Sequence, residues 1–119
     1  LIDAPCSALG IIRRHPEIRY RRGPQDIAER AVIARAILDN ARRYVKPGGV
    51  LVFAVCTYTR EETLDQLEYF SQFKDFEIVK SAEVNRGLWK EHLGLPYMDT
   101  RPAVELDGFA AFKAVRRNI

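Results

Sequence analysis

The sequence contains two cysteines, Cys6 and Cys56, which lie fifty positions apart. Two cysteines at this separation form neither a metal-ligand set nor a CxxC redox pair. A thiol can instead act as a nucleophile where a neighbouring group stabilises its thiolate in a partly open pocket. The alternative is that both side chains are small hydrophobic groups of the core, because free cysteine is among the most buried residue types. The elements that position the two thiols decide between these roles.

Each cysteine follows a segment that the sequence predicts to be a strand. Residues 1–3 are two branched apolar residues followed by Asp, and Pro comes soon after, a pattern typical of a strand end. Residues 50–55 are continuously apolar and largely β-branched, as in a strand buried on both faces of a parallel sheet. If the two strands are parallel neighbours, their carboxyl ends share the edge at which open α/β sheets bind ligands. We therefore expect Asp3, Cys6 and Cys56 to converge there.

Two helices are expected around the second strand. Between the two strands, apolar residues spaced by three and four predict an amphipathic helix over residues 25–45, which Pro47 and the glycines after it end. After the second strand, Thr59 and Glu62 have the spacing of a capping box, so a second helix is expected to run to about residue 72. The alternation of strands and helices is typical of an α/β fold.

The last third of the sequence predicts fewer regular elements. Residues 76–79 indicate a short strand, and residues 80–100 are expected to be a long surface connection. Residues 103–106 and 109–115 flank Asp107-Gly108, which is a strong signal for a two-residue hairpin turn.

Length and composition limit the class of protein. The 119 residues, 47% hydrophobic and 29% charged, suffice for one small domain with a single core. This composition excludes collagen, a disordered chain and a disulfide scaffold. The longest apolar run, residues 50–56, is far shorter than the roughly 18 residues of a membrane span, and no secretory signal pattern is present near the start. The sequence therefore predicts a soluble, unsecreted protein.

A cationic segment lies between the first predicted strand and the first predicted helix. Residues 13–22 read RRHPEIRYRR and contain five arginines, whereas the whole chain carries a net charge of only +3. Clustered arginines around an aromatic ring favour a phosphate-bearing partner. The other interpretation is a solvated loop whose arginines pair with acidic residues elsewhere in the fold.

Several motifs resemble those of a known family. Asp3-Ala4-Pro5-Cys6-Ser7, Cys56-Thr57 at the end of a strand, and Asp107-Gly108-Phe109 resemble successive motifs of the RNA cytosine-5 methyltransferases of the NOL/NOP/Sun type. Residues 12–18 and 22–27 are similar to the bacterial 16S ribosomal RNA branch of that family. The resemblance implies a partial Rossmann-like sheet, with parallel strands, crossover helices and an antiparallel carboxyl-terminal strand.

The resemblance runs through nearly the whole chain but covers only the carboxyl-terminal half of such a catalytic domain. The glycine-rich loop and acidic position with which the family binds S-adenosyl-L-methionine would precede Leu1. The chain begins with Leu1 and its only methionine is Met98, which also indicates a piece of a longer polypeptide. Residues 1–119 alone are therefore expected to be inactive and to bind the cofactor weakly or not at all. The sheet edge left by missing strands is expected to favour self-association.

The resemblance also implies roles for individual residues. Carbon 5 of cytosine is a poor nucleophile until carbon 6 is attacked, and Cys56 corresponds to the family's nucleophile for that attack. Cys6 corresponds to the cysteine that promotes loss of the proton from carbon 5. Asp3 corresponds to an aspartate that contacts both cofactor and target base, and Pro5 shapes the loop beside it.

The implied partner is RNA, in particular ribosomal RNA in the cytoplasm. The arginines of the cationic segment are expected to contact phosphates and so to position the RNA rather than read its sequence. They are Arg13, Arg14, Arg19, Arg21 and Arg22.

Two other functions remain open. One is a non-catalytic RNA-binding module in which the cysteines only pack, so that Cys56→Ser would leave every RNA-dependent function intact. The other is an enzyme that methylates an exocyclic nitrogen. Enzymes of that kind commonly carry an Asn/Asp-Pro-Pro-aromatic loop, and Asp3-Ala4-Pro5-Cys6 does not match it.

Overall fold

The structure, a computed structural model, describes residues 1–81, 88–100 and 107–118. Its elements, in chain order, are β1 (Ile2–Asp3), η1 (Leu9–Ile11), α1 (Ile18–Arg21), α2 (Pro24–Ala41), η2 (Arg42–Tyr44), β2 (Val50–Val55), α3 (Leu64–Phe70), β3 (Phe76–Val79), β4 (Trp89–His92), β5 (Leu95–Thr100) and β6 (Phe109–Arg116). The η elements are short 3-10 helices. None of the helices in this part of the chain is long and apolar enough to cross a membrane.

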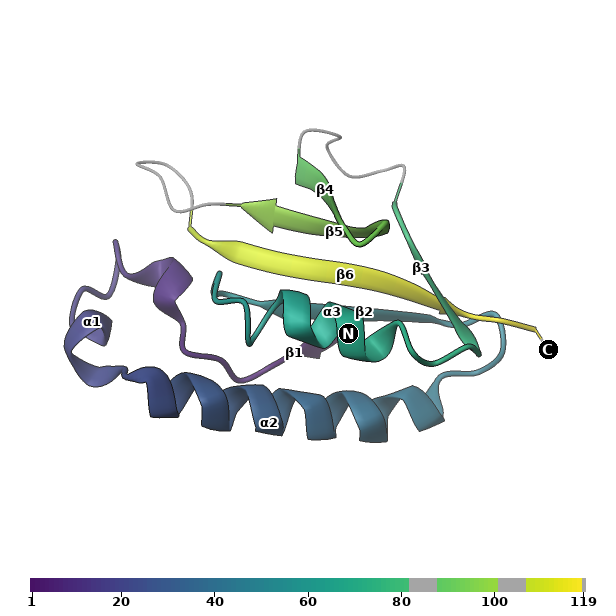
Figure 1. Cartoon of the computed structure of the whole chain (residues 1–119), viewed down its shortest axis with the longest axis horizontal. Coiled ribbons are helices and arrows are strands. Elements are labelled where there is room, and N and C mark those ends of the chain that lie inside the picture. Colours follow the sequence, from purple (N-terminus) through teal and green to yellow (C-terminus); the bar gives the residue numbers. More distant parts are fainter. Residues whose placement is uncertain (82–87, 101–106, 119) are drawn as a thin grey trace.

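The strands of the described residues form one six-stranded mixed sheet. β1 pairs parallel to β2, with Ile2 opposite Phe53 and Asp3 opposite Ala54. β6 pairs antiparallel to β2 over the whole length of β2. The other side of β6 pairs with β3 and β5. β3 therefore runs in the direction of β2, with β6 inserted between them (Figure 1). The expected α/β class, the parallel first pair and the antiparallel carboxyl-terminal strand are confirmed.

The two main helices, α2 and α3, cover the same face of the sheet (Figure 1). Ala34 and Leu38 of α2, and Leu67 of α3, are buried in the core against this face. The helix predicted over residues 25–45 is confirmed, because η2 continues α2 to Tyr44. The expectation that β2 is buried on both faces is wrong at its start: Val50 is exposed, because both helices pack on the opposite face.

Aromatic rings hold the centre of the core together. The ring of Phe53 on β2 stacks on that of Phe112 on β6, with centroids 5.3 Å apart. Phe70 of α3 lies 5.5 Å from Phe112 and 5.1 Å from Phe76. These contacts fix β2, β6 and α3 relative to one another. Cys56 directly follows β2, so its position is fixed with them.

The predicted capping box at Thr59 is wrong. α3 begins at Leu64, and its first residue is preceded by turns over residues 60–63. The hydroxyl of Thr59 donates to Glu62, but the Glu62 carboxylate turns inward and accepts its other hydrogen bonds from Ser7 and Thr57. Glu62 is 1% exposed, and a buried carboxylate needs more donors than the single backbone N–H of a cap.

Residues 80–100 are not the long surface connection that the sequence predicts. They contain β4 and β5, which pair as a hairpin, and β5 extends the sheet beside β6. The turn residues Leu93 and Gly94 both have positive φ, at 53° and 76°, as a two-residue hairpin turn requires. The strand expected over residues 109–115 is confirmed as β6, whereas its predicted hairpin partner, residues 103–106, lies outside the described residues.

Candidate active site at the paired cysteines

The parallel pairing of β1 and β2 brings the two cysteines together. Asp3 lies opposite Ala54, and the Ala4 N–H donates to the Ala54 carbonyl at 3.0 Å, so both chains leave the sheet at the same edge. The Sγ atoms of Cys6 and Cys56 are 3.4 Å apart, and both cysteines are free. Their predicted convergence is confirmed.

The contact between the thiols makes their acidities unequal. The hydrogen bond from Cys6 is the main cause that lowers the pKa of Cys56 from 9.0 to about 7, and the backbone N–H of Cys56 adds to it. Burial and the negative charges of Asp3 and Glu62 oppose this shift. The same hydrogen bond, together with burial, raises the pKa of Cys6 far above its ordinary value. Either thiol can donate in this contact, and the greater exposure of Cys56 favours it as the thiolate, with the buried Cys6 as its donor.

This difference predicts a pH-dependent alkylation pattern. Because only the thiolate reacts, the rate at which iodoacetamide modifies Cys56 should rise with pH and reach half its maximum near pH 7. Cys6 should stay unmodified over the same range. Mass spectrometry of peptides after timed alkylation measures both rates. Cys6→Ala removes the donor, so the midpoint for Cys56 should move upward toward 9.0; an unchanged midpoint would contradict the assignment.

A buried carboxylate ties the two cysteine loops together. Glu62 accepts hydrogen bonds from the Ser7 N–H at 2.6 Å and the Ser7 hydroxyl at 2.7 Å. It also accepts from the hydroxyl of Thr57 at 3.2 Å and that of Thr59 at 2.6 Å. Ser7 follows Cys6 directly and Thr57 follows Cys56, and their hydroxyl oxygens lie 2.9 Å apart. We call these four residues the Glu62 clamp.

Sequence reasoning missed the Glu62 clamp. The spacing of Thr59 and Glu62 matched a helix cap, and nothing local in the sequence indicates that Glu62 reaches Ser7, which is 55 positions away. The available signal was the presence of Ser and Thr immediately after the two cysteines.

Close backbone contacts attach a third segment to the same edge. The Gly10 N–H donates to the Cys56 carbonyl at 3.0 Å, and the Gly108 N–H donates to the Gly10 carbonyl at 2.7 Å. A Cβ atom at Gly10 would lie 2.0 Å from the Gly108 oxygen and 2.8 Å from the Cys56 oxygen. Only glycine therefore fits between the Cys56 loop and the start of β6.

Gly10→Ala is expected to displace the Cys56 loop. Both blocking atoms belong to the backbone, so the strain can be relieved only by separating the segments, at a cost of about 1–3 kcal/mol. The urea unfolding midpoint should fall, and the alkylation midpoint of Cys56 should rise. The matched control is Gly23→Ala, because the nearest atom to a Cβ at Gly23 is 3.8 Å away, in the Asp26 side chain. Equal effects of the two substitutions would contradict this interpretation.

The cationic segment folds back onto the cysteine edge. Arg22 donates to the Ser7 carbonyl at 3.1 Å and so contacts the Cys6 loop directly. Arg13 and Arg14 share the carboxylate of Asp107, at 2.8 and 2.9 Å, and the Arg13 hydrogen bond is the main cause that lowers the pKa of Asp107. Two cations thus share one carboxylate here.

The other predicted site residues are exposed. Asp3 ends β1, and its charge is close enough to raise the pKa of Cys56, while Pro5 is exposed between Asp3 and Cys6. Arg19 and Arg21 lie on α1, where the Arg19 guanidinium lies 5.4 Å from the ring centre of Tyr20. The structure thus brings Asp3, Cys6 and Cys56 together and leaves α1 at the surface.

Comparison with known proteins matches nearly the whole chain to one family. The sequence model described as 16S rRNA methyltransferase RsmB/F matches residues 1–109. The chain is 51% identical over 72 residues to ribosomal RNA small subunit methyltransferase B of Salmonella paratyphi A, which is 60% of this chain and 17% of that protein. It is 49% identical over 70 residues to the protein of the same name from Shewanella oneidensis, 59% of this chain and 16% of that one. The chain therefore spans about a sixth of these relatives.

Solved structures share the fold. The crystal structure of PH0851 superposes with a TM-score of 0.82 at 28% identity, over 94% of this chain and 25% of that one. The structure of NSun6 from Pyrococcus horikoshii with SFG gives a TM-score of 0.80 at 24% identity, over 99% of this chain and 29% of that one.

Proposed function

The chain belongs to the 16S rRNA methyltransferase RsmB/F family, and on this basis we propose that it is part of an enzyme that methylates carbon 5 of a cytosine in 16S ribosomal RNA. Residues 1–119 would form the carboxyl-terminal half of its catalytic domain. One observation carries the proposal: two free thiols lie 3.4 Å apart at the carboxyl edge of the sheet, one buried and the other half-buried.

The Cys56 thiolate starts the reaction in this proposal. It adds to carbon 6 of cytosine, and the electron pair of the C5–C6 double bond moves toward carbon 5, which becomes nucleophilic enough to take up a methyl group. A pKa of about 7 suits this task, since roughly half of the thiol is ionised at neutral pH. Asp3 is exposed, and in this proposal its carboxylate would hydrogen-bond the edge of the same base.

Cys6 completes the reaction. Its pKa is raised chiefly by the hydrogen bond to Cys56, but a Cys56 sulfur bonded to carbon 6 carries no negative charge. Cys6 can then lose its proton to water and accept the proton from carbon 5. The electron pair left on carbon 5 re-forms the double bond, the bond between Cys56 and carbon 6 breaks, and the Cys56 thiolate is released.

The methyl donor that we propose is S-adenosyl-L-methionine, which supplies a methyl group on a sulfonium. The residues at this edge fit a cationic ligand, because Asp3 offers an exposed carboxylate at the carboxyl end of a strand, where such sheets bind ligands. Asp3 and Pro5 would contact the cofactor beside Cys6. The structural similarity to NSun6 from Pyrococcus horikoshii, solved with the S-adenosylmethionine analogue SFG, supports this choice.

The substrate that we propose is RNA, held by the cationic segment through its phosphates. Arg13, Arg14, Arg19 and Arg21 are all exposed. Arg22, which contacts the Cys6 loop through the Ser7 carbonyl, would bind a phosphate beside that loop. A base within folded RNA must also be flipped out of its stack to reach the thiols.

Methylation of 16S ribosomal RNA by the full-length protein tests the proposal. RNA incubated with S-adenosylmethionine is digested to nucleosides and analysed by mass spectrometry, and 5-methylcytidine is the expected product. N4-methylcytidine would instead indicate an enzyme that acts on the exocyclic amine. RNA that is bound but unchanged would favour a non-catalytic binding module.

A further inference from the structure

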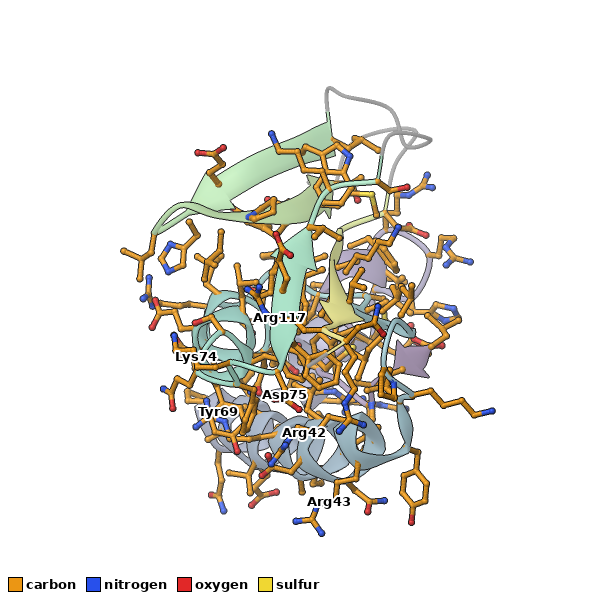
Figure 2. All side chains as sticks on the ribbon, turned by 90° about the vertical axis from the view of Figure 1, so that its right-hand side faces the viewer. Arg42, Arg43, Tyr69, Lys74, Asp75 and Arg117 are labelled. Carbon is orange, nitrogen blue, oxygen red and sulfur yellow. The ribbon has the colours of Figure 1, made fainter. Side chains whose placement is uncertain are left out.

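A second group of cations lies at the end of the molecule away from the cysteines, where β2 begins and β6 ends. Figure 2 looks onto this end and shows labelled side chains from η2, from α3 and the turn that follows it, and from the residue after β6. We call the group the basic end. It comprises Arg42, Arg43, Lys46, Lys74, Arg116 and Arg117.

Backbone hydrogen bonds fix the three segments of the basic end relative to one another. The Arg117 N–H donates to the Asp75 carbonyl at 2.8 Å, which joins the end of β6 to the α3–β3 turn. Gly48 and Gly49 exchange hydrogen bonds with Arg116, both at 2.8 Å, which joins the end of β6 to the turn before β2. The cations therefore sit on a rigid frame rather than on a loose tail.

Aromatic rings hold Arg42 of the basic end and the neighbouring Arg35 in place. The Arg42 guanidinium lies 3.8 Å from the ring centre of Phe73, and that of Arg35 lies 4.3 Å from the ring centre of Tyr69. The Tyr69 hydroxyl donates to Asp39 at 2.7 Å. The Asp39 carboxylate thus contacts both Tyr69 and Arg42, the latter at 3.7 Å. It therefore neutralises these inner groups rather than the exposed cations of the basic end.

The outer cations of the basic end are not neutralised. Arg43, Lys46, Lys74 and Arg117 are all exposed, and none has a carboxylate within 4.0 Å in the described residues. The Asp75 carboxylate lies 3.8 Å from Arg116 instead. Since the whole chain carries only +3, the basic end is, like the cationic segment, a local concentration of positive charge.

We propose that the basic end binds the phosphate backbone of RNA away from the nucleotide that is methylated. This inference rests on the proposed function and extends it. Exposed, unpaired Arg and Lys side chains on a rigid frame suit a polyanion, and the exposed ring of Tyr44 beside Arg43 can stack on an unpaired base. β2 alone separates the basic end from Cys56 by about 20 Å, so this contact engages a different part of the RNA from the target base.

A matched pair of charge reversals tests the inference in the full-length protein. Lys74 and Lys80 are exposed lysines that precede and follow the same strand, β3, but Lys80 lies outside the basic end and is 3.9 Å from Glu91. Lys74→Glu should weaken binding of a long 16S ribosomal RNA fragment about fivefold at moderate salt. It should also reduce the slope of log K against log salt by about 1. Lys80→Glu should stay within about twofold of the unmodified protein.

Two readouts separate this inference from the proposed function. A short oligonucleotide around the target cytosine should be methylated equally by the unmodified protein and by Lys74→Glu, because it does not reach the basic end. If the unmodified protein methylates no RNA, the proposed function fails. If Lys74→Glu binds the long RNA as tightly as Lys80→Glu does, the basic end does not bind RNA. If thermal melting shows that the Lys74→Glu protein is unfolded, Arg43→Ala replaces it, because it removes an exposed charge on η2.

Discussion

Replacing Cys56 with alanine is expected to lower methyl transfer more than about a thousandfold, whereas Cys6→Ala should leave the protein covalently joined to RNA. Cys56 is the half-buried thiol with the lowered pKa, so its removal eliminates the nucleophile that we propose. Without Cys6 the proposed adduct should still form, but the group that we propose takes the proton from carbon 5 is missing, so Cys56 should not be released. A denaturing gel of protein incubated with RNA and S-adenosylmethionine shows the adduct as a slower band.

Two controls sharpen this result. The double variant Cys6→Ala/Cys56→Ala should give no slower band, which would show that the adduct forms through Cys56. Because Cys6→Ala also raises the pKa of Cys56, the adduct should form faster at pH 8.5 than at pH 7 in that variant. If neither single variant traps RNA while both still bind it, the two-thiol mechanism is wrong and the binding module becomes the better hypothesis.

Glu62→Ala is expected to destabilise the protein by about 3 kcal/mol, through loss of the Glu62 clamp. The substitution leaves the Ser7 N–H and the hydroxyls of Ser7 and Thr57 buried without their acceptor, although the two hydroxyls can still bond to each other. For a domain of this size the melting temperature should fall by about 10 °C or more. The midpoint of urea unfolding measures the effect independently.

The neighbouring Glu61 provides the control for the Glu62 clamp. Glu61 is exposed, so Glu61→Ala should change stability by less than about 0.5 kcal/mol. Glu62→Gln keeps one oxygen acceptor and the shape of the side chain, and it should fall between the two. Slower formation of a Cys6–Cys56 disulfide under a mild oxidant would show that the thiols have moved apart. Equal stability of Glu61→Ala and Glu62→Ala would mean that the clamp contributes nothing.

Much of the fold follows from patterns within short stretches of the sequence. The apolar run of β2 and the three-and-four spacing along α2 both predict their elements correctly, because each pattern reflects burial of one element against a single core. The meeting of Cys6 and Cys56 also follows, since each comes after a strand and the two strands are parallel neighbours.

The hairpin of β4 and β5 shows where such patterns fail. Lys90 and Glu91 break the apolar alternation of β4, and Pro96 within β5 argues against a strand. The structure tolerates Pro96 because it lies opposite Glu91 of β4, while pairing of β5 with β6 begins only at Met98. Whether a proline interrupts a ladder depends on the neighbouring strand, which local sequence does not identify.

The sequence by itself determined the α/β class, the two thiols at one sheet edge and the family to which the chain is similar. The tertiary structure alone decided which thiol is favoured as the thiolate, because that depends on a 3.4 Å contact and on unequal burial. It also decided that Glu62 joins Ser7 to Thr57 and that cations from three segments form the basic end. The physical reason is that burial and periodicity act on neighbours along the chain, whereas hydrogen bonds and charges act between whichever groups the fold brings within a few ångströms.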